Sequence, residues 1–406
     1  MTDASPETPD DSDESKGSEP ICEPPGEMTP AQLDEARRYG NQKLRLGLLD
    51  KALDLVFLTA AALLLARPLD AWLAERGTSA TGRLALLYLA VMGLHALVSF
   101  PIAWRSGFVM EHRFGLSRQS FGRWFGFQAL ALGVAVPLGL AMVVGWFWII
   151  WLCGPWWWPA AAAAYYLSMV VMGRLAPVLI LPLFYKTEPL DDPDLTERLQ
   201  RLAAGTRLTL GGVFRLRLGS ETKKANAMLT GMGRSRRVLL SDTLLDQFTP
   251  EEIEVIFAHE VGHHVFRHLP KRLLEGAVFS LLGFWLCDRA ALAWMQSTQS
   301  EGVAQAASTV LASPLHALPV HALPLMMLVL TLYMLLVSPL QNALSRRDER
   351  QCDRYAIDRT GHRAAYVSAF QKLARQNKAN PVPHPLEVRL FHDHPPIAER
   401  IAMAKE

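Results

Sequence analysis

Apolar residues in this 406-residue chain gather in six long runs, separated by shorter polar segments. Most of these runs reach the roughly 20 residues that an α-helix needs to cross the hydrocarbon core of a bilayer. Buried helices of a large soluble protein are the alternative, but six such runs in one chain make that explanation a poor one. The runs cover residues 50–67, where Asp54 interrupts the pattern, 84–104, 126–152, 156–183, 272–295 and 317–340.

Tryptophan and basic residues indicate how these helices lie in the bilayer. Four tryptophans bracket the turn between the third and fourth runs, where they mark a membrane interface. The loops after the second and fourth runs are rich in Arg and Lys, and the opposite loops are poor in both. The positive-inside rule therefore predicts that the basic loops and both termini face the cytoplasm. The membrane would be the inner membrane of a bacterium or the endoplasmic reticulum of a eukaryote.

The remaining segments divide the chain further. Residues 1–28 are acidic and polar, which predicts a disordered tail, and 29–183 form a first membrane region of about four spans. Residues 184–270 alternate enough to suggest strands at 207–220 and 235–245, with a hairpin at 226–233. Residues 271–340 form a second membrane hairpin, and 341–406 close the site.

Composition adds limits to this picture. Half of the residues are apolar, and the net charge of +2 results from an acidic tail set against a basic remainder. Because the basic residues follow the predicted topology, they give no indication of nucleic-acid binding. Reduced thiols are expected, since the cysteines are scattered. They are Cys22, Cys153, Cys287 and Cys352.

The sequence HEVGH at 259–263 is the strongest chemical signal in the chain. His259 and His263 are four residues apart, so on a helix both rings can reach one zinc ion. Glu260 can then take a proton from the attacking water, while zinc supplies Lewis acidity. The alternative is a pair of core histidines, but that would leave Glu260 without a partner in apolar surroundings.

The residues before the motif predict the start of its helix. Thr249 can cap it, Pro250 suits its first turn, and the two glutamates that follow favour its positive end. Gly262 is unfavourable inside a helix, so another element is expected to approach it closely. His264 and His268 are further histidines of the same predicted helix and are assigned no role.

The third zinc ligand is less evident. Phe266 and Leu269 occupy the places where a metzincin has its glycine and third histidine, so that arrangement fails. A carboxylate on a later helix is the other source, and Glu349 with Asp353 four residues on is the best candidate. Asp353 would hydrogen-bond the far nitrogen of a ligand histidine. The charge pattern alone, however, favours a solvated helix with local ion pairs.

Several ordered stretches resemble the CAAX prenyl protease 1 type of integral-membrane zinc metalloendopeptidases. They are HEVGHH, SRRDERQCD and FHDHPPIAERI, with further likeness in VMEHRFGLSRQSFGRW, LILPLFYKTEPLDDPDLTERLQRLA and KKANAML. The resemblance covers residues 36 to 404. The chain departs from the family pattern at Cys352, where alanine is usual, in the lack of a first span, and in its acidic tail.

The resemblance implies roles for specific residues. Glu349 becomes the third zinc ligand and Asp353 its neighbour in the outer shell. His394 and Arg400 match residues that face the substrate and the developing oxyanion, and Asn226 matches an asparagine of the substrate-binding strand. Without the resemblance, His394 is an ordinary loop histidine and Asn226 is as readily a turn residue.

The predicted fold is therefore mainly α: a multi-spanning transmembrane helical bundle with a small α+β, gluzincin-like cytoplasmic portion. The predicted function is a zinc metalloendopeptidase with one Zn²⁺ per chain, acting on peptide or protein substrates at the cytoplasmic membrane face. The resemblance implies cleavage near the C-terminus of CAAX-like or prenylated proteins. Membrane-protein quality control by the same chemistry is an alternative. A transporter with a structural zinc would need a fourth protein ligand, and the intact Glu260 argues against an inactive scaffold.

Overall fold

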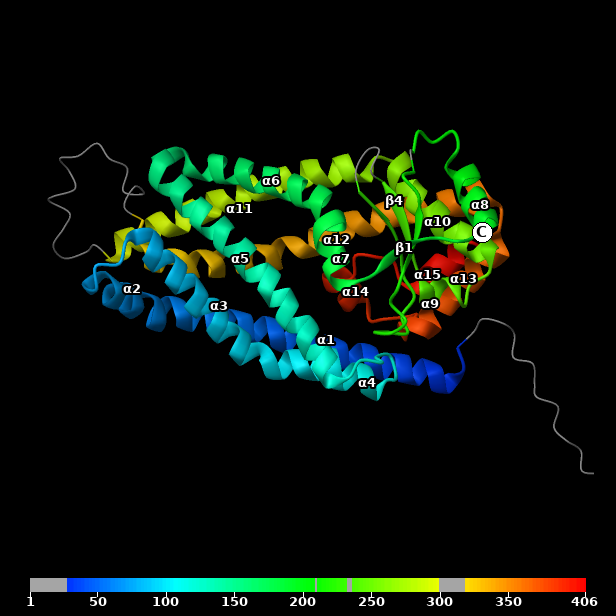
Figure 1. The fold of residues 1–406 in the computed structure, drawn as a ribbon, viewed down its shortest axis with the longest axis horizontal. Coiled ribbons are helices and arrows are strands. Elements are labelled where there is room, and N and C mark those ends of the chain that lie inside the picture. Colours follow the sequence, from blue (N-terminus) through cyan, green and yellow to red (C-terminus); the bar gives the residue numbers. More distant parts are fainter. Residues whose placement is uncertain (1–27, 209, 232–235, 299–317) are drawn as a thin grey trace, which may run out of the picture.

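The computed structural model describes residues 28–208, 210–231, 236–298 and 318–406. Long helices extend along the molecule, and a small sheet with several short helices lies at one end (Figure 1). The fold is mainly α, as predicted. The predicted acidic tail, except for Met28, lies outside the described residues.

The long helical runs alternate in direction, toward and away from the sheet-bearing end (Figure 1). Short π-helical segments join the paired helices, and Gly154, whose φ of 50° favours glycine, marks the turn between the third and fourth runs. The runs are α1 Pro30–Ala60 with α2 Ala66–Glu75, α3 Ala80–Trp104 with α4 Glu111–Arg113, α5 Phe121–Cys153, α6 Trp157–Leu175 with α7 Leu181–Phe184, α11 His268–Thr298 and α12 Leu323–Thr360.

Four helical stretches of the described chain are long and apolar enough to cross a membrane. They are Ala80–Arg113, Phe121–Phe184, His268–Gln296 and Val320–Thr360. The second contains both predicted runs on either side of the Gly154 turn. The predicted run at 50–67 is helical, but it is not among the four.

The packing of these helices also suits a bilayer. Phe147, Trp157 and Phe284 are buried between helices in one continuous apolar core. Large side chains face outward as well, and Leu97 and Leu336 are 74% and 80% exposed. Apolar surface of this kind is unfavourable in water but suits contact with lipid.

The sheet has the strand order β1-β2-β4-β3. Strands β2 and β4 are parallel, while β1 pairs with β2 and β3 with β4 in antiparallel fashion. The antiparallel pairing of β3 with β4 agrees with the predicted hairpin, although part of its turn, residues 232–235, lies outside the described residues. Residues 242–245, predicted as strand, form a short helix. The elements are β1 Thr187–Pro189, β2 Val213–Leu216, β3 Ala227–Thr230, β4 Arg237–Ser241 and α9 Asp242–Leu245.

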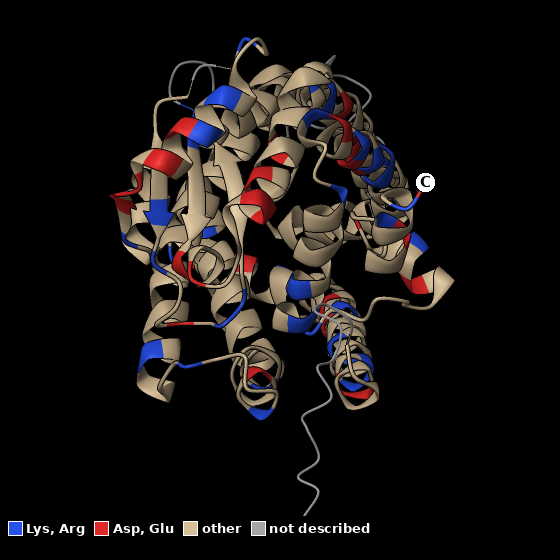
Figure 2. Ribbon diagram, turned by 90° about the vertical axis from the view of Figure 1, so that its right-hand side faces the viewer, with Lys and Arg blue, Asp and Glu red and all other residues tan. Residues whose placement is uncertain are grey.

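Helix α10, Pro250–Val265, packs under the sheet. Its Phe257 and Val261 join Leu240 of β4 in a second apolar core. Charged residues are spread over this end of the molecule (Figure 2), where the start of α1 and the C-terminus also lie (Figure 1). The other short helices are α8 Pro193–Ala203, α13 Arg363–Asn377, α14 Pro385–Phe391 and α15 Ile397–Met403.

Candidate active site

Helix α10 carries the HEVGH motif, and its first turn has the predicted cap. The Thr249 side chain accepts a hydrogen bond from the backbone of Glu252, whose carboxylate accepts one from the backbone N–H of Thr249. Pro250 takes the first helical position, where no N–H donor is needed. A cap of this kind stabilises a helix by about 1 kcal/mol. The motif therefore starts from an anchored helix.

Helix α12 crosses α10 at Gly262. A Cβ atom on this glycine would lie 3.1 Å from Cys352 Cα and 3.2 Å from its Cβ and Sγ. Any larger residue would have to push the two helices apart, so the predicted close approach at Gly262 is confirmed. The crossing brings Glu349 and Asp353, one turn apart on α12, next to the histidines of α10.

His259, His263 and Glu349 converge on one point. His259 Nε2 lies 3.0 Å from Glu349 Oε2, and His263 Nε2 lies 3.3 Å from Glu349 Oε1. Two ligand atoms that each bind one tetrahedral zinc ion at about 2.0–2.1 Å are about 3.3 Å apart. The three side chains are therefore spaced as zinc ligands would be.

The position of the proton on His259 also indicates a cation between His259 and Glu349. His259 Nδ1 lies 2.9 Å from Asp353 Oδ1 and donates its proton there. Its Nε2 then directs a lone pair at Glu349 Oε2, which is buried and receives no well-formed hydrogen bond. Two buried acceptors facing each other repel unless a proton or metal ion lies between them. Two imidazoles and a carboxylate are a donor set that suits zinc.

Cys352 is a competing third ligand. His259, His263 and Cys352 present ligand atoms that all lie within 4.8 Å of one another. Its Sγ also lies 3.6 Å from His268 Nδ1, at the buried helix crossing. Both arrangements share the two histidines, which could hold a metal ion in either case. Glu349 as third ligand stays a prediction, favoured by its distances.

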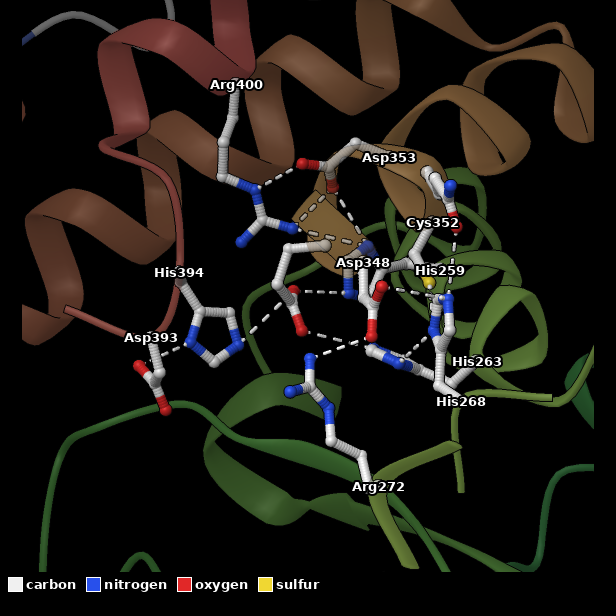
Figure 3. Close-up of polar contacts among 12 residues, drawn as sticks. His259, His263, His268, Arg272, Asp348, Cys352, Asp353, Asp393, His394 and Arg400 are labelled. Carbon is white, nitrogen blue, oxygen red and sulfur yellow. Dashed lines mark hydrogen bonds and ion pairs between the residues drawn. The ribbon is translucent and has the colours of Figure 1, made fainter. Parts of the chain in front are cut away.

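Asp353 connects His259 to Arg400 (Figure 3). Arg400 Nε donates to Asp353 Oδ2 at 2.9 Å, and its Nη2 donates to Oδ1. All three side chains are buried. Burial opposes the charge on Arg400, but Asp353 outweighs it and raises the pKa of the guanidinium. In this structure Arg400 therefore contacts Asp353, and its predicted contact with substrate is untested.

His394 approaches the same point from the loop before α15. Its Nε2 lies 3.3 Å from Glu349 Oε2, and its Nδ1 lies 2.8 Å from Asp393 Oδ1. The hydrogen bond to Asp393 raises the pKa of His394 above its ordinary value. About half of its side chain is exposed, so it lies on the open side of the site.

A cavity of about 570 Å³ opens beside these residues. Glu260, His263 and Glu349 line it, together with part of strand β3. One wall is apolar and is formed by α6, β3 and α11. The apolar lining residues are Met169, Val170, Leu229, Leu269 and Leu273. A volume of this size is typical of a ligand-binding cavity.

Two histidines that were assigned no role have partners here. His264 Nδ1 accepts a hydrogen bond from Arg236, which lines the cavity. No acidic partner of Arg236 occurs in the described ranges. His268 is buried and contacts His263. These partners come from other elements or from across a turn, and sequence spacing does not reveal them.

Asn226 lies directly before strand β3, at the edge of the sheet. Its backbone N–H donates to Ser241 Oγ at 2.9 Å, and its side chain is exposed. Because β3 has a sheet neighbour on one side only, an extended peptide could pair with the other. A role of Asn226 in substrate binding stays a prediction.

Two family models match this chain. The model of peptidase family M48 matches residues 189–406, and the model "CAAX prenyl protease N-terminal, five membrane helices" matches residues 23–186. Helices α1 to α7 of the described chain fall within the second match, which marks the protein as a multi-pass membrane protein.

Individual proteins show the same likeness. The uncharacterized metalloprotease YhfN of Bacillus subtilis is 27% identical over 95% of this chain and 88% of its own length. A CAAX prenyl protease 1 homolog of Arabidopsis thaliana is 28% identical over 78% of this chain and 72% of its own length. The crystal structure of S. mikatae Ste24p superposes with a TM-score of 0.76 at 20% identity, covering 93% and 89% of the two chains, and shows the same fold.

Proposed function

The chain belongs to peptidase family M48 and is a membrane zinc metalloendopeptidase, and we propose that it cleaves protein substrates at the cytoplasmic face of its membrane. His259, His263 and Glu349 would hold the zinc ion and leave a fourth position open. Their spacing beside a substrate-sized cavity is the observation that carries this proposal. A structural zinc site in a transporter would be closed by a fourth protein ligand.

Each polar residue of the site has a part in peptide hydrolysis. Bound zinc supplies Lewis acidity. Glu260 takes a proton from the attacking water and gives it to the leaving amine. His394, whose pKa is raised by its hydrogen bond to Asp393, donates to the oxygen that becomes negative in the transition state. Arg400 acts through Asp353, because its guanidinium is buried against that carboxylate.

The cavity favours a substrate of particular chemistry. Its apolar wall suits aliphatic side chains, and Arg236 presents a cation that no described acidic residue neutralises. A short apolar segment that ends in a free carboxylate satisfies both features, with its backbone paired along β3. The C-terminus of a CAAX-like protein has this chemistry, and relatives of this chain bear the name CAAX prenyl protease 1. General quality control of membrane proteins is the second candidate.

The Arg- and Lys-rich loops support a cytoplasmic site. Cys153 is exposed at the turn between α5 and α6, far from the sheet (Figure 1). An impermeant thiol reagent added to intact cells should label Cys153 in a Cys22→Ser background. It should not label Ser220→Cys, near the sheet, once Cys153 is also replaced by serine. The reverse pattern would place the site on the opposite side.

Glu260→Gln provides the test of the activity. The variant should keep one zinc ion per chain and lose peptide hydrolysis, because Glu260 is a proton carrier and not a ligand. Metal analysis and comparison of the N- and C-termini of membrane proteins in cells with either form would check this. Identical termini in the two cell lines would contradict the proposal. Glu349→Ala should lose zinc, whereas Cys352→Ala should keep it.

Peptide pairs test the substrate class. Peptides that end in a carboxylate should be cleaved faster than the same peptides ending in an amide, and Arg236→Gln should remove most of the difference. Equal rates for both endings in the wild-type enzyme would favour the quality-control alternative.

A further inference from the structure

His268 is the other buried histidine of this region, and a turn brings it to the zinc ligands. On a continuous helix, residues five apart point about 140° away from each other, so His263 and His268 could not meet. Helix α10 ends at Val265, and Arg267 takes a left-handed conformation with φ of 55°. This turn starts α11 in a new direction and places the two rings face to edge, with centroids 5.1 Å apart.

Both ring nitrogens of His268 have partners (Figure 3). Its Nδ1 lies 3.1 Å from His263 Nδ1, and its Nε2 lies 3.2 Å from Gln351 Oε1. Only 3% of the residue is exposed. A buried imidazole is unfavourable unless it is hydrogen-bonded, and these contacts satisfy it.

The proton positions follow from the zinc ligand. If His263 binds zinc through Nε2, the atom nearest Glu349, then its Nδ1 carries a proton. That proton can only be donated, so His268 Nδ1 accepts it. The remaining His268 proton lies on Nε2 and is donated to Gln351 Oε1. The neutral tautomer of His268 with its proton on Nε2 therefore satisfies both hydrogen bonds, the one from His263 and the one to Gln351.

The surrounding charges agree with a neutral His268. The nearest carboxylate oxygen, Asp348 Oδ1, lies 3.7 Å from Nε2, beyond hydrogen-bonding distance. The Asp348 carboxylate is already paired with Arg272, whose Nη2 donates to Oδ2 at 2.7 Å. The thiol of Cys352, 3.6 Å from Nδ1, is a weak donor that competes little with the imidazole.

We propose that His268 is a positioning residue for zinc: it accepts the proton of His263 Nδ1 and so holds that ligand in the orientation and tautomer that zinc requires. This rests on the proposed function for the identity of the metal ligands. Outer partners of this kind typically change metal affinity by about 10–100-fold.

Three variants test this in the full-length, detergent-solubilised protein, with zinc affinity measured by chelator competition. His268→Leu should weaken zinc binding by about 10–100-fold, because His263 Nδ1 loses its acceptor. His268→Asn should recover most of the affinity, since its side-chain oxygen can accept the same proton. The control is His362→Leu, a histidine that is 43% exposed on its side chain and pairs with Glu254; it should bind zinc like wild type.

The visible spectrum of the cobalt-substituted protein provides a second measurement, because it depends on the ligands of the metal and not on packing alone. The visible spectrum of the cobalt-substituted His268→Leu protein should differ from wild type, and that of His268→Asn should resemble it. Unchanged zinc affinity in His268→Leu would overturn the proposal. Equal weakening in the Leu and Asn variants would do so too, because the ring would then matter only for packing. A wild-type protein that binds zinc but cleaves no peptide would refute the proposed function and leave this measurement valid.

Discussion

His259 and His263 lie on the same helix and face the same point, yet different chemistry supports them. His259 Nδ1 donates to the Asp353 carboxylate, which Arg400 neutralises, and we call Asp353 and Arg400 the charged support. His263 Nδ1 contacts the imidazole of His268, which is hydrogen-bonded to Gln351, and we call His268 and Gln351 the neutral support.

The two supports also differ in how they are built. The charged support needs α12 and the C-terminal helix α15, and its residues are buried. The neutral support depends on the short turn at Phe266 and Arg267, between α10 and α11, and on a residue of α12. Charge-assisted hydrogen bonds are about twice as strong as neutral ones. Changes in the charged support should therefore affect both zinc affinity and folding more strongly than changes in the neutral one.

Asp353→Asn should have the largest effect. Asparagine keeps the shape but leaves Arg400 buried without an opposite charge, and breaking a buried pair in this way costs about 3–5 kcal/mol of stability. Zinc affinity should fall by about 100-fold, the upper end of the usual range for such partners. Thermal unfolding and chelator competition would measure both, with the exposed Asp358→Asn on the same helix as control. A loss of zinc affinity smaller than that of His268→Leu would reverse the proposed ranking.

The charged support also predicts a pH dependence in the metal-free protein. Burial disfavours the charged imidazole, but the carboxylates of Asp353 and Glu349 beside it outweigh burial and raise the pKa of His259 from 6.5 to about 9. A raised folded-state pKa contributes stability that is complete below about pH 6.5 and is lost as the pH rises through about 9. The difference, 9 − 6.5 = 2.5 units, corresponds to about 3 kcal/mol.

Unfolding of the chelator-treated enzyme between about pH 6 and pH 10 would measure this loss. The Asp353→Asn variant should show a flatter profile, because one of the two carboxylates is gone. If the stability of the wild-type protein does not fall across this window, then folding does not raise the pKa of His259.

Arg400→Lys should have an intermediate effect. Lysine keeps the positive charge but cannot form the two parallel contacts of a guanidinium, and one charged hydrogen bond is worth about 1.5–3 kcal/mol. Zinc affinity should fall less than in Asp353→Asn, because His259 keeps its acceptor. Zinc titration alongside turnover at saturating zinc would check this. Normal zinc affinity with a lost rate would instead support the sequence-based assignment of Arg400 to the substrate.

The two supports show what sequence could predict. A spacing of four on a helix fixes a shared face, so His259 with His263 and Glu349 with Asp353 could be paired within their helices before any fold was known. The glycine at 262 was a further signal, since only a close helix crossing explains it. Such local rules, with the apolar runs, gave the membrane helices and the ligand candidates.

Sequence could not predict contacts that a turn or a distant helix creates. His268 was assigned no role because the pattern suggested that the helix continues through it, whereas α10 ends at Val265 and Arg267 turns the chain. Arg400 was assigned from resemblance, and its burial against Asp353 depends on how α15 packs. The run at 50–67 illustrates a third limit: its helix begins at Pro30, far before the apolar pattern does.

Gly262→Ala should act on both supports, since both use residues of α12. The added methyl group would lie 3.1 Å from Cys352 Cα, and overpacking of this kind costs about 1–3 kcal/mol. Better helix propensity offsets about 1 kcal/mol of that. A modest loss of stability and of zinc affinity is therefore expected in unfolding and chelator titrations. Gly276→Ala, a helical position with no atom within 4 Å of the added group, should not be destabilising.

Gln351→Leu should have the smallest effect on zinc. It removes the acceptor of His268 Nε2, and one neutral hydrogen bond contributes about 0.5–1.5 kcal/mol. Asp348 Oδ1, 3.7 Å from the same nitrogen, can take over part of the role after a small shift. A loss of zinc affinity between about 2-fold and 10-fold is expected in chelator competition.

Gln351→Glu turns this prediction into a direct test of the comparison. A carboxylate at this position would accept the same His268 proton and make the neutral support resemble the charged one. His268 would then become a better acceptor for His263 Nδ1–H, because a carboxylate that accepts the Nε2 proton makes the opposite ring nitrogen of the neutral imidazole more basic. Zinc affinity should therefore rise above wild type, in the opposite direction to Gln351→Leu. If both substitutions weakened zinc binding equally, the hydrogen bond from His268 to Gln351 would have no part in holding the metal, and the difference between the two supports would end at His268 itself.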